Sequence, residues 1–218
     1  MVQGRRDAAL MALAGGLWTG ICWLLAQLAY PHLPPKVPVH FNLYWQPDGW
    51  ASKGVLLWLM PLTVAIVWAV IGAVTSLATV QERRLLWQVQ WWIGMFMVAV
   101  QGSLLLTALG WLHSPRPILM PALGLLLVAI GRLCPQLPQN RFVGVRVPWT
   151  LKDEVVWRQV HQVAGLWLTA LGVGFVTVAV LPLPVWTDAV LMLSLLAIFV
   201  ALCSYAVRLY RRRSAQTP

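Results

Sequence analysis

Six long stretches of the chain contain no charged residue, and this feature constrains the fold more than any other. Cutting the sequence at every Asp, Glu, Lys and Arg leaves apolar runs at Ala8–Tyr30, Gly54–Gln81, Leu85–Leu112, Pro117–Gly131, Gln162–Thr187 and Ala189–Val207. A helix needs about 20 mostly apolar residues to cross the hydrocarbon core of a bilayer. The fourth run is short, but the long side chain of Arg132 can reach the interface, which lets Leu133 and Cys134 extend it. The runs predict six membrane-spanning helices.

The composition excludes an ordinary soluble domain. Of all residues, 60% are hydrophobic and 10% are charged, whereas globular proteins have about 45 to 50% and about 25%. The 14 Trp residues fit a membrane protein, because indole rings favour the boundary between hydrocarbon and headgroups. We therefore expect an all-α polytopic membrane protein built as a six-helix bundle.

The positions of the cations predict the orientation of the chain, because short cytoplasmic loops retain Lys and Arg. With the amino terminus inside, six spans place most cations in the cytoplasm: Arg5, Arg6, Arg83, Arg84, Arg132, Arg141, Arg146, Lys152, Arg158, Arg208, Arg211, Arg212 and Arg213. The others, Lys36, Lys53 and Arg116, fall outside. This bias predicts that both termini are cytoplasmic. Since the cations are spread over several loops, they do not indicate a nucleic-acid-binding domain.

The six spans divide into two regions of three. Residues 1–112 hold the first three spans and an external loop at 31–53, and residues 113–218 hold the last three spans and a cytoplasmic segment at 140–161. The apolar run after Arg5 and Arg6 can also be interpreted as a cleaved secretory signal. We favour a retained first span, because the run exceeds a usual signal core and its loss would leave an odd number of spans.

The external loop between the first two spans is rich in proline and aromatic residues. Prolines at positions 31, 34, 35, 38 and 47 exclude a regular helix. We predict an extended segment and then a turn at Pro47-Asp48-Gly49, since Pro presets φ and Gly accepts positive φ. The loop would cap the bundle, with three aromatic residues at the outer interface: Tyr44, Trp45 and Trp50.

The cytoplasmic segment between the fourth and fifth spans contains a helix signal. Thr150 and Asp153 have the spacing of a capping pair, which predicts a helix that starts at Leu151 and continues through His161 into the fifth span. Pro148 would set the turn into this helix. His161 is expected to be a polar residue at the interface, and one helix face would turn toward lipid or core: Val156, Trp157 and Val160.

Four side chains on the external side could in principle bind zinc: His32, His40, Asp48 and His113. Imidazole and carboxylate groups are zinc ligands, but the spacing of these residues places no two of them on a common face. We therefore expect no metal and no cofactor. The alternative is that His40 hydrogen-bonds within the loop and Asp48 bonds the backbone of its own turn.

Two segments carry a resemblance to a known family. The run Asn140-Arg-Phe-Val-Gly-Val-Arg-Val-Pro-Trp-Thr-Leu-Lys-Asp-Glu-Val-Val-Trp157 resembles the signature of the SdpI family of bacterial membrane proteins. The external loop resembles the companion domain upstream, through residues 37–42 and 47–53. Two positions depart from the pattern: Val147 replaces a usual Thr, and Trp45 a frequent Gly. The resemblance marks these candidate partner-binding residues: Pro38, His40, Asn42, Asp48, Gly49, Asn140, Arg141, Gly144, Arg146, Pro148, Trp149, Thr150, Glu154 and Trp157.

This resemblance implies a bacterial cytoplasmic-membrane protein that gives immunity to a secreted, membrane-active peptide toxin. It also implies signalling, in which the toxin-bound protein holds a cytoplasmic transcriptional repressor at the membrane. The implied partners are the bilayer, a peptide on the outer face and a repressor on the inner face. Cytoplasmic cations could bind an acidic face of such a partner or, equally, anionic headgroups: Arg141, Arg146, Lys152 and Arg158.

Catalysis and transport are two other classes of function, and both use polar groups inside the bilayer. No predicted span has a charged residue near its centre, and the usual hydrolase and phosphate-loop motifs do not occur, so we expect no enzyme. A small transporter or a lipid- or peptide-handling protein is the alternative, which polar side chains converging at mid-depth would favour. The milder polar residues can bond across helices: Gln27, Thr63, Thr75, Gln101, Ser103, Thr169 and Ser194. Several glycines should allow close helix packing: Gly15, Gly16, Gly20, Gly165, Gly172 and Gly174.

Overall fold

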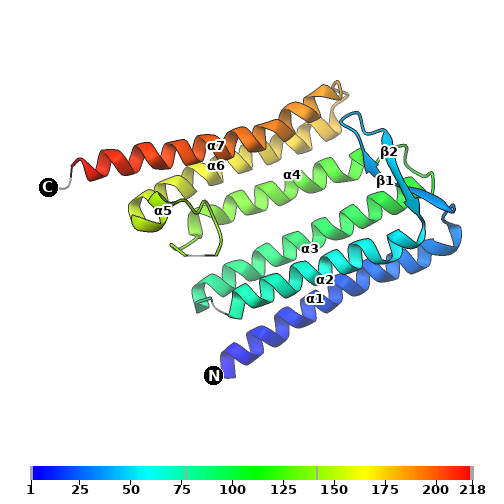
Figure 1. Ribbon diagram of the computed structural model, residues 1–218, viewed down its shortest axis with the longest axis horizontal. Helices are drawn as coiled ribbons and strands as arrows, with labels where there is room; N and C mark the ends of the chain where they lie inside the picture. The colour runs from blue at the N-terminus through cyan, green and yellow to red at the C-terminus, as the bar shows by residue number, and fades with distance from the viewer. Residues whose placement is uncertain (1, 77, 141, 217–218) are drawn as a thin grey trace.

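The structure, a computed structural model, describes residues 2–76, 78–140 and 142–216. Six long helices lie side by side in it (Figure 1): α1 (Val2–Ala29), α2 (Gly54–Ser76), α3 (Val80–Ala108), α4 (Arg116–Leu133), α6 (Glu154–Val180) and α7 (Trp186–Ser214). Each contains a segment that is long and apolar enough to cross a membrane. The predicted all-α, six-helix polytopic membrane fold is confirmed.

The connections make the two ends of the bundle different. After α1, a short 3-10 helix η1 (Tyr30–His32) leads into strands β1 (Lys36–Phe41) and β2 (Pro47–Ser52), which pair antiparallel. This hairpin lies at one end of the bundle, the hairpin end, and both chain termini lie at the other, the termini end (Figure 1). The 3-10 helix η2 (Cys134–Gln136) and the short helix α5 (Pro148–Lys152) also lie at the termini end.

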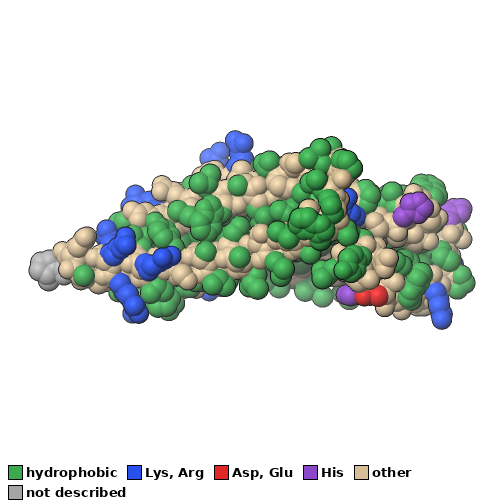
Figure 2. All heavy atoms as spheres, turned by 90° about the horizontal axis from the view of Figure 1, so that it is seen from above, with side chains coloured by type: hydrophobic (Ala, Val, Ile, Leu, Met, Phe, Trp, Pro, Cys, Tyr) green, Lys and Arg blue, Asp and Glu red, His purple; other side chains and the backbone are tan. Residues whose placement is uncertain are grey.

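Charge is distributed unequally between these ends. Figure 2 shows that most Lys and Arg side chains on the visible face gather toward the termini end, whereas His side chains lie toward the hairpin end. The apolar surface between them is the part that would contact lipid. The structure thus separates the cations as the sequence predicts, and the cytoplasmic location of the termini end stays a prediction.

Several helix boundaries differ from the apolar runs, because a charged residue ends an apolar stretch without ending a helix. Helix α3 begins at Val80 rather than Leu85, since Thr79 and Glu82 form a reciprocal capping box, in which Glu82 accepts from the Thr79 N–H at 2.5 Å. Helix α2 ends at Ser76, whereas the second apolar run continues to Gln81. Helix α6 begins before Gln162, and α7 continues past Val207 through its arginines.

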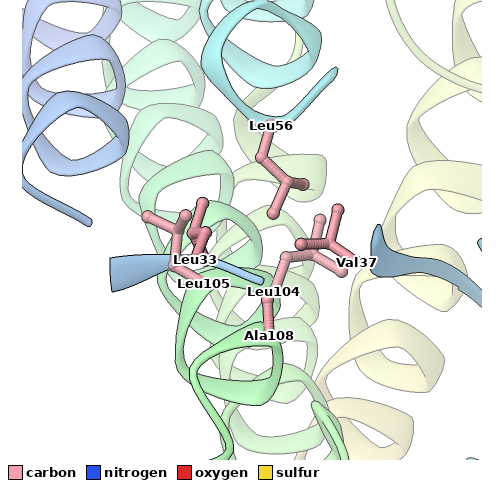
Figure 3. Packing of buried hydrophobic residues seen from close by; sticks show 6 residues of the cluster. All are labelled: Leu33, Val37, Leu56, Leu104, Leu105 and Ala108. Atoms are coloured by element: carbon pink, nitrogen blue, oxygen red, sulfur yellow. The ribbon is translucent and has the colours of Figure 1, made fainter. Parts of the chain in front are cut away.

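The hairpin is attached to the bundle by a small apolar core. Val37 of β1 is fully buried, and it packs with Leu33 before the strand and Leu56 at the start of α2. Figure 3 shows these side chains meeting Leu104 and neighbouring residues of α3. Strand β1 is therefore anchored on α3, which confirms the prediction that this segment is extended and caps the bundle.

Helices α4 and α6 approach each other through two pairs of glycines. A Cβ atom on Gly172 would lie 2.5 Å from the carbonyl oxygen of Gly124, and one on Gly165 would lie 2.6 Å from that of Gly131. The predicted close-packing role is confirmed for Gly165 and Gly172. It is wrong for Gly16 and Gly20, because a Cβ atom at either position would meet nothing within 4 Å.

Replacing Gly172 by alanine is expected to lower the free energy of unfolding by about 1 to 3 kcal/mol, because the added methyl group meets backbone that has to shift. The matched control is Gly102→Ala, where a Cβ atom would meet nothing within 4 Å. That change is expected to be neutral or to stabilise α3 by up to about 1 kcal/mol. Denaturant unfolding in micelles measures both variants. Equal effects of the two would contradict the close α4–α6 contact.

Candidate functional site

The segment that the sequence predicts to be cytoplasmic forms a folded unit at the termini end, which we call the motif segment (residues 140–161). It runs from the loop after η2 through α5 into the first two turns of α6. Arg141 lies outside the described residues. The predicted helix start at Leu151 is wrong. Helix α5 already begins at Pro148, and α6 begins at Glu154, because Asp153 caps the second helix.

Asn140 builds the turn that opens the motif segment. Its side-chain oxygen accepts hydrogen bonds from the backbone N–H groups of Phe142 and Val143, both at 2.8 Å. Its amide nitrogen donates to the carbonyls of Pro138 and Val143, at 2.8 and 3.1 Å. The side chain is buried and uses both its donor and its acceptor. Aspartate could not donate the second pair of bonds, so the position requires asparagine.

Thr150 is fully buried beneath the same loop. Its hydroxyl lies 2.7 Å from the carbonyl of Val145, to which it donates, and accepts from the N–H of Val147 at 3.1 Å. The Gln139 side chain donates to the backbone carbonyl of Thr150 at 2.7 Å. Thr150 therefore fixes the loop from inside α5. The prediction that it caps a helix starting at the next residue is wrong.

His161 and Trp157 hold the loop onto α6. The N–H of Val145 donates to Nε2 of His161 at 3.0 Å, so the ring proton lies on Nδ1, which donates to the carbonyl of Trp157 at 2.8 Å. The two rings stack at 4.0 Å, and the Trp157 indole N–H donates to the carbonyl of Leu137 at 2.8 Å. Both side chains are almost completely buried. The expectation that His161 is an interfacial residue is wrong.

Gly144 is required by this arrangement. It adopts φ of 116°, a conformation that L side chains rarely adopt, and a Cβ atom there would collide with Nε2 of His161. Only glycine allows the backbone to pass this close to the imidazole. In this chain, Gly144 is thus required because His161, which follows the segment that resembles the family signature, occupies the space.

The remaining candidates of the motif segment form its surface. Arg146, Pro148 and Glu154 are exposed, and Trp149 is half-buried. Arg146 donates to the carbonyl of Phe142 at 3.0 Å, and Glu154 pairs with Arg158 at 3.3 Å. Buried residues therefore shape the motif segment, and these exposed residues are available to a partner.

Asp153 connects the motif segment to the last helix. One carboxylate oxygen caps α6 by accepting from the N–H groups of Val155 and Val156, at 2.8 and 3.1 Å, and the other accepts from Arg213 at 2.8 Å. The Arg213 guanidinium, together with these two amides, holds the pKa of Asp153 below its ordinary value. The carboxylate stays charged at any pH above its usual range.

Replacing Asp153 by alanine is expected to cost about 0.5 to 2 kcal/mol, because the helix cap is lost. Asp153→Asn keeps the cap and loses only the partly exposed ion pair, which is worth less than about 1 kcal/mol. Because the folded-state pKa is depressed, the wild-type advantage over the Asn variant is present above about pH 4 and disappears as the pH falls below that value. Unfolding followed from pH 3 to 7 measures this difference, and a gap that stayed constant over the range would contradict it.

The hairpin end contains a buried charge cluster that the sequence did not reveal. Asp188, in the first turn of α7, is 2% exposed. It binds the guanidinium of Arg116 through both carboxylate oxygens, at 2.6 and 3.1 Å, and it accepts from the indole N–H of Trp45 at 2.7 Å. Arg116 also donates to the carbonyl of Val178 at the end of α6. This cluster, which we call the Asp188 cluster, joins the hairpin to α4, α6 and α7.

The turn of the hairpin lies at residues 42–46. Asn42 makes it, since its side-chain oxygen accepts from the N–H groups of Tyr44 and Gln46, at 2.9 and 3.1 Å. Trp45 adopts φ of 61° within this turn, the region that favours glycine. The predicted turn at Pro47-Asp48-Gly49 is wrong, because these residues belong to β2.

The remaining hairpin candidates lie on or beside the strands. Pro38 is buried in β1, and Gly49 of β2 lies opposite His40, whose Cβ atom leaves no room for a side chain. His40 and Asp48 form an exposed pair at 2.5 Å, so His40 does bond within the hairpin. Asp48 therefore contacts a side chain rather than its own turn. Among the described residues, no group of three His, Cys, Asp or Glu could hold a metal ion.

Comparison with known proteins identifies both segments. Residues 136–206 match the SdpI/YfhL protein family, and residues 17–65 match the Domain of unknown function (DUF1648). Over 152 residues the chain is 26% identical to the protein named Immunity protein SdpI of Bacillus subtilis (strain 168), an alignment that covers 70% of this chain and 73% of that relative. Residues 136–206 therefore resemble the SdpI/YfhL family, and most of the chain resembles that immunity protein. It is a multi-pass protein of a bacterial cell membrane. No solved structure matches it.

The two family matches cover different parts of the molecule, and the second includes helices that run the length of the bundle. The DUF1648 match contains the hairpin with parts of α1 and α2, and the SdpI/YfhL match contains the motif segment from Asn140 onward with α6 and most of α7. In this chain, the residues of the motif segment shape one end of the bundle and the hairpin shapes the other.

Proposed function

We propose that this SdpI-like membrane protein gives immunity to a secreted, membrane-active peptide by binding it at the hairpin end, and that the motif segment binds a cytoplasmic transcriptional repressor. The protein acts by binding, without catalysis. The observation that carries this proposal is the placement of the hairpin and the motif segment at opposite ends of one six-helix bundle. The name of the Bacillus subtilis relative, Immunity protein SdpI, supports immunity as the role.

The hairpin end offers an apolar surface to a peptide that arrives from outside. Leu43 and Tyr44 at the hairpin turn are 69% and 67% exposed, and Trp50 of β2 is 58% exposed. Large aromatic and apolar side chains are the groups that bind peptides most strongly once water is removed. They stand on a hairpin that is anchored on α3, so they are presented without a large loss of conformational entropy.

The motif segment offers a different surface, with cations and an aromatic ring. Arg146 is exposed on the loop that Asn140 and Gly144 shape, and Trp149 is half-buried beside it on α5. An acidic face of a repressor would complement this surface, and anionic headgroups are the competing ligand. The buried hydrogen bonds of the segment support a specific partner, because binding lipid charge alone does not require a fixed loop.

Polar groups inside the bundle give little support to the transport alternative. Four hydroxyls donate to carbonyls four residues earlier in their own helices, those of Thr63, Thr75, Thr169 and Ser194. Gln101 donates across to the carbonyl of Leu56 at 3.2 Å, as predicted for a packed helix interface. Buried polar atoms without a hydrogen-bond partner among the described residues belong to Trp18, Trp68, Gln90 and Gln101, and none of these side chains carries a charge.

The test is survival of a toxin-sensitive bacterium that expresses the protein, challenged with a panel of secreted membrane-active peptides. Wild type should protect against at least one peptide, and Leu43→Ser with Trp50→Ser should remove the protection. Arg146→Gln with Trp149→Ser should keep membrane insertion and lose repressor recruitment to the membrane. Survival equal to that of an empty vector across the panel would refute immunity, and repressor recruitment by the second variant would refute the assigned role of the motif segment.

A further inference from the structure

Helix α7 is bonded by an ionic contact at each of its two ends. At the hairpin end, Asp188 in its first turn binds Arg116 of α4 and the indole of Trp45. At the termini end, Arg213 in its last turn donates to Asp153 at 2.8 Å. One helix therefore contacts the turn of the hairpin and the residue that caps α6 in the motif segment.

The termini end of α7 also packs directly on the motif segment. Leu202 and Ala206 are buried with Val156 and Val160 of α6, and Val145 and Val147 of the motif loop pack against the same group. These are apolar contacts between close-packed side chains, so a shift of α7 changes them together with the Arg213–Asp153 pair. The motif segment is thus in continuous contact with α7.

The rest of α7 is held loosely in comparison with the other helices. Only 11% of the most apolar stretch of α7 is buried inside the bundle, whereas 28% or more is buried in each of the other five spans. A helix with few buried contacts along its length moves at a lower cost than one buried on several sides. Along its middle, α7 packs on the core of α4 and α6 through partly buried Leu191, Met192, Leu195 and Ile198, and the contacts of Asp188 and Arg213 hold its two ends.

Trp45 is held in an unfavourable conformation at the contact with Asp188. Its φ of 61° lies in a region that bulky L residues rarely adopt. Such a residue persists only where its surroundings hold it, and the hydrogen bond from its indole to the buried carboxylate is a contact that does so. Release of the indole would let residues 42–46 adopt a second arrangement and would remove one of the hydrogen bonds to the Asp188 carboxylate.

We propose that α7 couples the hairpin to the motif segment: the Trp45–Asp188 bond sets the position of α7, and α7 sets the packing of the motif segment through Leu202, Ala206 and Arg213. The physiological meaning of this coupling rests on the proposed function, in which a peptide bound at the hairpin would displace Trp45. The coupling itself is a property of the chain without a ligand. By linkage it is reciprocal, so a change at Arg213 affects the hairpin as a change at Trp45 affects the motif segment.

Amide hydrogen exchange of the full chain in lipid nanodiscs tests the coupling. Trp45→Phe keeps an aromatic ring but loses the indole N–H donor. It should raise the amide exchange rate about tenfold or more at residues 42–46, because a hydrogen bond to a charged group is lost. It should also raise exchange several-fold at residues 148–157, at the far end of the bundle. The matched control, Tyr44→Phe, alters an exposed neighbour in the same turn and should change neither region.

The reciprocal arm uses a partly exposed site at the end of α7, where a substitution puts folding at little risk. Arg213→Gln should raise exchange at residues 42–46, whereas Arg212→Gln, the adjacent exposed cation, should not. The proposal is overturned if Trp45→Phe leaves residues 148–157 at the wild-type rate, whether or not residues 42–46 respond, or if Arg213→Gln leaves the hairpin unchanged. A chain that shows the exchange coupling but fails to protect cells would refute immunity and leave the coupling standing.

Discussion

Replacement of Asp188 by alanine should lower the free energy of unfolding by about 3 to 5 kcal/mol, because it leaves the partly buried guanidinium of Arg116 without its counter-charge. The carboxylate is almost completely buried and binds Arg116 through both oxygens. It also accepts from Trp45, whose donor would lose its partner in the variant. Equilibrium unfolding in micelles, followed by tryptophan fluorescence, measures the loss.

A double variant separates the cost of a broken pair from the value of the intact pair. Arg116→Met combined with Asp188→Leu removes both charges and keeps much of the volume, so it should be clearly more stable than Asp188→Ala. Ser194→Ala, at a half-buried position farther along α7, is the control for changes within this helix and should have little effect. A loss below about 1 kcal/mol for Asp188→Ala would show that water or lipid headgroups solvate these charges and that the protein does not bury them.

Replacing Trp157 by alanine is expected to have an effect of similar size, about 3 to 5 kcal/mol, because a large buried ring is lost and a cavity remains. The side chain is 0% exposed, stacks on His161 and donates to the carbonyl of Leu137. Trp157→Phe keeps an aromatic ring beside His161 but not the donor, so it should cost about 1 to 3 kcal/mol.

The loss should be local before it is global. In the alanine variant, proteolysis of the loop at residues 142–147 should precede loss of the helical signal, since the N–H of Val145 is bonded to the neighbouring His161 ring, which stacks on Trp157. Chemical unfolding and limited proteolysis together make this measurement. If alanine were tolerated as well as phenylalanine, the packing of Trp157 would not be what holds the motif segment.

The membrane fold could be predicted from the sequence because its cause is local. A run without charge has to be buried in lipid or protein, and each of the six runs became the centre of a long helix. The ends of the helices were harder to predict from the sequence, because caps such as that of Asp153 on α6 depend on backbone geometry. The spacing of Thr150 and Asp153 predicts a helix start at Leu151, which is three residues before the observed start of α6 at Glu154.

The two sites were harder to predict, because their decisive contacts join distant parts of the chain. Trp45 adopts positive φ in a turn and contacts Asp188, which is 143 residues away. Asp188 had a usable signal, since it is an acidic residue that separates the last two apolar runs. His161 also had one, because it lies one helical turn after Trp157 on the same face of α6. The family resemblance identified the segments but could not show which of their residues are buried.

The glycine contacts of α4 and α6 restrict how the bundle can change shape. The pairs Gly124–Gly172 and Gly131–Gly165 bring backbone against backbone at two points about two helical turns apart. Sliding one helix along the other, or rotating it about its axis, would force larger side chains such as Val128 and Val176 into both gaps at once. These two helices therefore keep a fixed register and behave as one rigid body, and any rearrangement between the two faces of the membrane has to occur in the helices around them.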